Sequence, residues 1–141
     1  TFAPEHFARV TQVDTMKRKQ FVKGMEQIAQ EGAIQIFKTP YTGMEEVIVG
    51  VVGTLQFDVF QYRMKNEYNV ELVMEGLPYE YLRWIDAYDG DPEDIIKGND
   101  VKLVEDYKGN QLLLFASLWS INWTAERNKQ LTLLEFGGAK F

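Results

Sequence analysis

The sequence predicts an α+β fold, and three kinds of local pattern support that prediction. The run 47–52 is apolar and mostly β-branched, which is typical of a strand buried on both faces. The stretches 16–30 and 54–66 place apolar residues at helical spacing. Short alternating stretches separated by turn residues occupy 79–136. With 141 residues, 45% of them hydrophobic and 13% aromatic, the chain can bury a core, and its length suits one domain or one and a half.

Residues 1–76 are expected to follow the order β-α-β-β-α-β. In the first helix, Phe21, Met25 and Ile28 share an apolar face, while lysines occupy the other face. Asp14 or Thr15 is the expected N-cap of that helix. In chain order, the expected elements are strand 7–13, helix 16–30, strand 33–38, a turn at 39–43, strand 47–52, helix 54–66 and strand 70–75. This order is that of a ferredoxin-like split plait, a two-layer sandwich of one sheet and two helices.

The second expected helix is apolar on two opposite faces. One face carries Leu55, Val59 and Tyr62, and the other carries Phe57, Phe60, Met64 and Tyr68. A helix that rests on one sheet needs a single apolar stripe. The second face is therefore expected to be covered as well. Residues 77–141 are the simplest candidate for that cover, and another domain of a longer protein is the alternative.

Residues 77–141 are expected to form a β-rich extension packed on the second helix. The expected elements are strands 79–88, 101–107, 111–115 and 131–136 and a helix that begins after Ser117. The turn between the second and third of these strands contains Gly109, which is free to adopt a positive φ. We therefore expect a single domain, 1–141, made of a plait (1–76) and a β-rich subregion (77–141).

The charges are unevenly distributed along the chain. The net charge is −6, which argues against a generic nucleic-acid-binding protein. Residues 75–106 hold ten acids against three bases. Residues 1–74 balance nine acids with eight bases, and residues 107–141 carry two acids and four bases. A surface that contacts phosphate must therefore avoid residues 75–106.

Few residues are suited to catalysis or to metal binding. The chain has no Cys, which removes disulfides, thiolate chemistry and zinc sites of the Cys type. Its single histidine, His6, is far in sequence from the two serines, so a catalytic triad is not expected. The acidic run 89–94 lacks the spacing of an EF-hand and reads instead as a helix cap, with Asp91 before Pro92. A phosphate-loop motif is absent as well. We expect no catalytic, cofactor or metal site in this chain.

The sequence also bears on the location of the chain. No apolar run approaches the roughly 18–20 residues that span a bilayer, and no basic-then-apolar leader is present. The chain begins at Thr1 rather than at Met, and structure is expected from the first residues. We expect a cytoplasmic location and a piece of a longer protein.

Six basic residues on the two expected helices are candidates for contact with RNA phosphates. They are Lys17, Arg18, Lys19, Lys23, Arg63 and Lys65. Contacts of this kind position a protein without reading base sequence. The plainer interpretation of the four on the first helix is a solvated surface, because exposed lysines are ordinary. The plainer interpretation of Arg63 and Lys65 is ion pairing with Glu67 and Asp58, worth about 0.2–0.5 kcal/mol per pair.

Several motifs occur in the order known from one family. The central one is IVGVVGTLQFDVFQYRMKNEYNV at 48–70, in which a strand ends at Gly53 and Thr54 can cap the following helix. The others are FAPEHF at 2–7, KQ at 19–20, EGA at 31–33, RW at 83–84 and NWTAER at 122–127. In this wording the chain resembles the third domain of the ribosomal translocases and, within that group, the C-terminal domain of the bacterial peptide chain release factor 3 family. The motif Leu-Gln-Phe-Asp separates it from elongation factor G, whose equivalent turn usually reads Gly-Glu-Leu-His. Residues 137–141 depart from the usual charged ending of the family, so no role is assigned to them.

The resemblance implies a ribosome-facing domain of a GTP-hydrolysing translation factor, one that helps to eject the stop-codon-reading release factor after peptide release. It places GTP or GDP and Mg in a missing N-terminal domain. The implied partners are the RNA and proteins of the small ribosomal subunit, the other domains of the parent chain and, indirectly, the stop-codon-reading release factors, with no membrane.

Two other interpretations remain. One is a small-molecule-binding regulatory plait with no ribosome role, since such folds bind ligands at strand edges. The other is a free-standing enzyme, which the shortage of His, Cys and Ser weakens.

Overall fold

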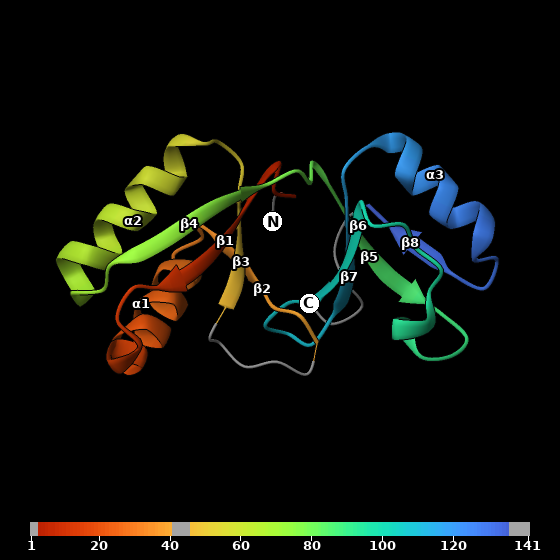
Figure 1. Ribbon diagram of the computed structural model, residues 1–141. Helices are drawn as coiled ribbons and strands as arrows, with labels where there is room; N and C mark the ends of the chain where they lie inside the picture. The colour runs from red at the N-terminus through yellow and green to blue at the C-terminus, as the bar shows by residue number, and fades with distance from the viewer. Residues whose placement is uncertain (1–2, 41–45, 136–141) are drawn as a thin grey trace.

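The computed structural model describes residues 3–40 and 46–135, and these form four layers (Figure 1). Helices α1 (Arg18–Gln30) and α2 (Leu55–Tyr68) cover one face of a first sheet. A second sheet packs on the other face of the first, and α3 (Leu118–Arg127) covers the far side of the second sheet. Each interface between layers has its own apolar core. The predicted α+β class is confirmed: two antiparallel sheets and three helices make up the described residues.

Sheet 1 has the strand order β2-β3-β1-β4, and every pair of neighbours is antiparallel. Its strands are β1 (His6–Gln12), β2 (Gln35–Phe37), β3 (Glu46–Val51) and β4 (Leu72–Leu77). The prediction that 47–52 is a central strand is confirmed, because β3 lies between β1 and β2. Residues 41–43 of the expected turn lie outside the described residues.

The alternation of side chains explains why β3 is apolar on both faces. Val47, Val49 and Val51 point into the core beneath the two helices. Ile48 points the other way, into the core between the sheets, and so does Phe7 of β1. A strand with cores on both sides reads as a continuous apolar run rather than an alternating one.

Strand β4 begins two residues later than expected because the end of α2 uses the intervening backbone. Asn69 adopts the left-handed conformation (φ 58°), and its N–H donates to the Lys65 carbonyl (3.1 Å). The Val70 N–H donates to the Met64 carbonyl (3.0 Å), so it closes the helix instead of joining the sheet.

Sheet 2 has the order β6-β7-β5-β8, again with antiparallel neighbours. Its strands are β5 (Tyr81–Ala87), β6 (Val101–Glu105), β7 (Gln111–Phe115) and β8 (Thr132–Leu134). The predicted hairpin is confirmed, with Gly109 at φ 81° in its turn. Asp106 Oδ1 fastens that turn by accepting hydrogen bonds from the N–H groups of Lys108 and Asn110, both at 2.9 Å.

Three of the four helix caps predicted in the sequence are formed, and Asp14, before α1, is one of them. Asp91 Oδ1 accepts from the Glu93 N–H (3.0 Å) at the start of the 3-10 turn η2 (Pro92–Asp94), as the capping interpretation of the acidic run requires. Ser117 caps α3 in a reciprocal capping box with Ser120.

The fourth predicted cap, Thr54, is wrong. Its backbone is already helical (φ −61°, ψ −27°), and its hydroxyl caps nothing. Gln56 Oε1 instead fastens the turn that precedes the helix, where it accepts from the N–H groups of Val52 and Gly53, both at 3.0 Å.

The prediction that the β-rich extension packs on the second helix is also wrong. Phe60 and Met64 of α2 are buried against sheet 1, but Leu55, Val59 and Tyr62 on the opposite face are 72%, 49% and 68% exposed. The extension lies against the other face of sheet 1 (Figure 1). That face of sheet 1 is also apolar, and it forms a buried core with the second sheet.

The two sheets are also joined at one edge. Lys38, just after β2, and Glu105 of β6 exchange two backbone hydrogen bonds, Lys38 N–H to Glu105 O (2.9 Å) and Glu105 N–H to Lys38 O (2.8 Å). Their side chains form an ion pair at 3.3 Å. This bridge ties the extension to the first half of the chain and helps to fix the relative position of the sheets.

Candidate functional site

Asp14 organises the segment that leads into α1. Its Oδ1 accepts a hydrogen bond from the Met16 N–H (2.9 Å), and its carbonyl accepts one from the Lys17 N–H (3.2 Å), which starts the 3-10 turn η1 (Thr15–Lys17). Of the two predicted caps, Asp14 is the one used. The turn directs Lys17 toward the end of α2, where its Nζ donates to the backbone carbonyl of Asn69 (3.0 Å).

Three of the predicted basic residues lie together on the outward side of α1, and we call them the α1 basic face: Arg18, Lys19 and Lys23. Lys19 and Lys23 are exposed, and Arg18 is half-buried. Within the described part of the chain, Lys19 and Lys23 have no hydrogen bond or ion pair. All three line an open depression along the helix, in which Glu26 is the one carboxylate among the described residues. Exposed cations held on a helix can contact an anionic partner.

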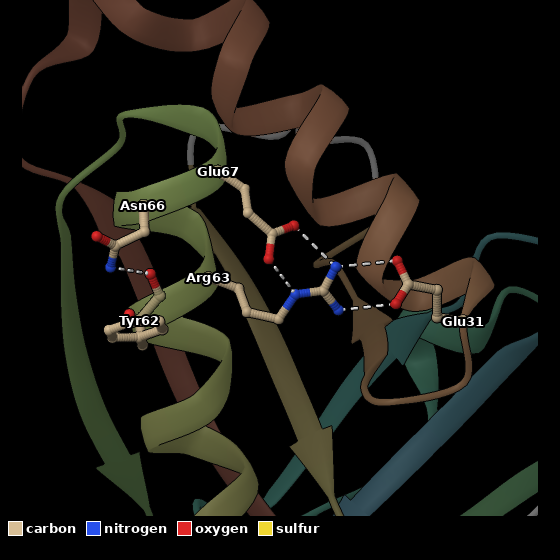
Figure 2. Close-up of polar contacts among 5 residues, drawn as sticks. All are labelled: Glu31, Tyr62, Arg63, Asn66 and Glu67. Carbon is tan, nitrogen blue, oxygen red and sulfur yellow. Dashed lines mark hydrogen bonds and ion pairs between the residues drawn. The ribbon is translucent and has the colours of Figure 1, made fainter.

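Arg63 belongs to a different arrangement, an ion-pair cluster between α1 and α2 (Figure 2). Its Nη1 and Nη2 donate to Glu31 Oε1 (2.8 Å) and Oε2 (3.1 Å), just beyond the end of α1. Its Nε and Nη2 also donate to Glu67 Oε2 (2.8 Å) and Oε1 (2.9 Å), one turn along α2. The planar guanidinium therefore holds two carboxylates in bidentate fashion and links the two helices.

The electrostatics of this cluster follow from its geometry. The Arg63 hydrogen bonds lower the pKa values of the Glu31 and Glu67 carboxyl groups below their usual range. The two carboxylates in turn raise the pKa of Arg63, first through the hydrogen bonds to Glu67. All three groups are charged at neutral pH. The predicted pairing of Arg63 with Glu67 is confirmed; the strongest cross-helix partner is Glu31, which the sequence did not indicate.

Lys65 and Lys17 line a second depression, at the end of α2. Lys65 Nζ pairs with Glu71 Oε1 at 3.4 Å, and both side chains are well exposed. Asn69 also lines this depression, and its carbonyl accepts from Lys17 Nζ. The structure thus divides the six predicted residues into three on the α1 basic face, two beside Asn69 and one within the ion-pair cluster.

Two residues that bind the predicted basic side chains, Glu31 and Asn69, were not predicted from the sequence. Glu31 lies 32 residues before Arg63, so no local spacing could connect them. Asn69 had a usable signal, because an asparagine just after a helical pattern often adopts the left-handed conformation that ends a helix. That conformation presents the Asn69 carbonyl to Lys17.

Other classes of site were also sought. Across residues 3–40 and 46–135, no group of three or more His, Cys, Asp or Glu side chains is arranged to hold a metal ion. None of the helices in that part of the chain has the length and apolar character needed to cross a bilayer. Ser117 and Ser120, the two serines, are engaged in the cap of α3.

Comparison with known proteins identifies the family. The family model described as class II release factor RF3, C-terminal domain, matches residues 1–125. A peptide chain release factor 3 from Symbiobacterium thermophilum is 44% identical over 131 residues, which is 93% of this chain and 25% of the relative. Its counterpart from Listeria welshimeri is 45% identical over 132 residues, 94% of this chain and 24% of the relative. That from Staphylococcus haemolyticus is 43% identical over 132 residues, 94% of this chain and 25% of the relative.

The chain spans about a quarter of the length of these curated relatives. The match nonetheless covers nearly the whole of this chain, including α1, α2 and strands β1 to β7. It favours the release-factor resemblance over the regulatory plait and the free-standing enzyme. The chain belongs to the family of C-terminal domains of class II release factor 3.

Proposed function

We propose that this chain is the ribosome-binding domain of a translational GTPase that promotes dissociation of the stop-codon-reading release factor after peptide release. Support comes from the family match over residues 1–125 and from relatives named peptide chain release factor 3. In this proposal, GTP or GDP and Mg bind in a preceding domain of the parent protein. This chain contributes recognition, not catalysis, and works in the cytoplasm.

The proposed partner of the α1 basic face is ribosomal RNA of the small subunit. The observation that carries this assignment is the exposure of Lys19 and Lys23 on the outer side of a well-packed helix, where neither forms an ion pair within the described part of the chain. Phosphate contacts need cations on a rigid element and no particular base sequence. Lys17 and Lys65 form a second, weaker candidate contact, because each already has a partner within the chain.

Arg63 has a different part in the proposal. Three of its nitrogen atoms already donate to Glu31 and Glu67, so most of its donors are engaged inside the molecule. We infer that it positions α1 relative to α2, and so positions the α1 basic face, more than it contacts RNA itself. Its remaining N–H is available to a phosphate.

We also infer that residues 1–76 form a ferredoxin-like plait and that 77–141 form a β-rich subregion of the same domain. The strand order β2-β3-β1-β4 with antiparallel neighbours supports this, as do two helices packed on one face. The core between the sheets and the Lys38–Glu105 bridge support treating 1–141 as one unit. A rigid unit of this kind suits a domain whose position on the ribosome is to be coupled to the other domains of the parent protein.

The test compares binding to purified small ribosomal subunits as salt is varied. In the Lys19→Glu, Lys23→Glu double variant, we expect affinity to fall roughly tenfold or more and the slope of log affinity against log salt to flatten by about 2. The control is Lys108→Glu with Lys129→Glu, two exposed lysines of the β-rich region, which should change neither quantity appreciably. Equal affinity and equal slope in the two double variants would remove the α1 basic face from the proposal.

A further inference from the structure

Helix α3 presents two large apolar side chains to solvent at its first turn. Leu118 is 56% exposed and Trp119 is 68% exposed. The opposite side of the helix is packed against the protein, because Ile121 contacts the core against sheet 2 and Ser120 and Thr124 are buried. The capping box fixes the start of the helix. Trp119 is thus held outward on a rigid element, which reduces the entropy lost when a partner covers it.

The aromatic surface continues one turn along the helix. Trp123 is four residues beyond Trp119, so the two indoles lie on neighbouring positions of one side of α3. The Arg127 guanidinium stacks over the Trp123 ring at 4.1 Å from its centroid. We call Leu118, Trp119, Trp123 and Arg127 the α3 tryptophan face. Trp and Arg are the residue types that dominate binding energy at protein interfaces.

The end of an acidic segment is hydrogen-bonded to both ends of α3. Asn128, at the end of α3, accepts from the Ile96 N–H through Oδ1 (2.8 Å) and donates to the Ile96 carbonyl through Nδ2 (2.7 Å). Just before α3, the Ala116 N–H donates to the Asp100 carbonyl (3.1 Å). The stretch 96–100 therefore runs between the two ends of the helix. Residues 89–100 and 117–129 together carry six acids against three bases.

This charge decides which class of partner fits. The negative surroundings repel nucleic-acid phosphates, so a base of RNA stacking on Trp119 would bring its backbone into an unfavourable potential. The same potential attracts cationic side chains. An aromatic anchor on a helix beside an acidic segment matches a protein segment that combines basic residues with an apolar side chain.

We propose that the α3 tryptophan face binds a basic protein segment that places an apolar side chain against Trp119 and pairs its Lys or Arg residues with the acids of 89–100. This goes beyond the RNA contact proposed for α1, and it uses none of the same residues. The two surfaces lie at opposite ends of the molecule, because α1 and α2 form one outer layer and α3 forms the other (Figure 1). The domain would then hold RNA at one end and protein at the other.

The test uses labelled peptides of twelve residues and fluorescence anisotropy at physiological ionic strength. The probe repeats Lys-Lys-Leu; the matched peptides repeat Glu-Glu-Leu and Lys-Lys-Ser, and a twelve-nucleotide oligouridine is the RNA arm. The protein variants are Trp119→Ala and, as control, Tyr62→Ala, which removes an aromatic side chain of equal exposure (68%) from α2. Because both residues are on the surface, neither variant should impair folding.

We expect the Lys-Lys-Leu peptide to bind best, and Trp119→Ala to weaken that binding about tenfold or more while Tyr62→Ala changes it less than about twofold. We also expect the oligouridine affinity to be the same in Trp119→Ala as in the parent chain. The proposal is overturned if Lys-Lys-Leu does not bind, if the two variants bind it equally, if the Glu-Glu-Leu or Lys-Lys-Ser peptide binds as tightly, or if Trp119→Ala abolishes RNA binding. Loss of RNA binding in the Lys19→Glu, Lys23→Glu variant tests the other surface separately.

Discussion

Gly24 controls how closely α1 approaches α2, and replacing it with alanine tests that packing. A Cβ at this position would lie 2.7 Å from Met64 Sδ and 2.9 Å from two ring atoms of Tyr68. These distances are well under the 3.4–4 Å of ordinary van der Waals contact. Met64 is fully buried, and one of the Tyr68 atoms is Cγ, next to the backbone, so neither side chain can simply swing away. The helices must separate to accommodate the methyl group.

Two opposing effects set the size of the change. Alanine favours a helix interior over glycine by about 1 kcal/mol. Overpacking a tight interface costs about 1–3 kcal/mol. Because two neighbours are approached at once, we place the cost at the upper part of that range and expect Gly24→Ala to lower the free energy of unfolding by roughly 1–2 kcal/mol. For a chain of this size the midpoint of thermal unfolding should fall by roughly 3–8 °C.

The assay is urea unfolding followed by tryptophan fluorescence, with a thermal scan by circular dichroism. Gly53→Ala is the matched control, because a Cβ there meets nothing within 4 Å and the residue has no positive φ. It should shift the free energy of unfolding by no more than about 0.5 kcal/mol. If Gly24→Ala proved as stable as Gly53→Ala, the close approach of α1 and α2 would not be a constraint, and the reasoning would fail.

Three further predictions use the same unfolding assay. Phe60→Ala, on the buried face of α2, should cost about 3–5 kcal/mol, whereas Val59→Ala on the exposed face should cost no more than about 0.5 kcal/mol; similar losses would mean that the outer face is covered after all. Ser117→Ala should cost about 1 kcal/mol through loss of the capping box, and a change near zero would show that the cap does not stabilise α3. Arg63→Met should reduce stability more at pH 7 than at pH 3. The pKa of Glu31 is lowered in the folded chain by its hydrogen bonds with Arg63, so the ion pair stabilises the fold fully above the pKa of the unfolded chain. That stabilisation is lost as the pH falls through the lower pKa of the folded chain. An equal loss at both pH values would count against the ion-pair cluster.

Much of the fold could be predicted because its signals are local. Apolar spacing located both helices of the first half, and β-branched content identified β3. The capping roles of Asp14, Asp91 and Ser117 depend on neighbours two or three residues away, which a sequence displays directly. Element ends were less accurate, as at β4, where the closing hydrogen bonds of α2 delay the strand.

The sequence predicted which basic residues belong to the candidate site, but it did not predict how the fold divides them among separate places. The cluster of basic residues near the start of α1 is visible in the sequence, and two of its members prove exposed. The partition of the six residues depends on α1 meeting α2, which places Glu31 against Arg63 and Asn69 against Lys17. For the α3 tryptophan face, the sequence predicted the helix but not which of its residues are exposed. That exposure depends on which side of α3 packs against sheet 2.

The amino-acid sequence alone determined the elements, their order, the acidic character of 75–106 and the family resemblance, since each is written in neighbouring residues. Only the tertiary structure decided which apolar faces of the helices and sheets are buried and which elements cover them. The second helix offered two apolar faces, and local pattern could not tell which would be buried. One of them packs on sheet 1, and the second sheet packs on the far side of sheet 1, because that side is apolar as well and the two sheets bury it in a shared core. That choice leaves Leu55, Val59 and Tyr62 at the surface and sets the basic and aromatic faces at opposite ends of the molecule.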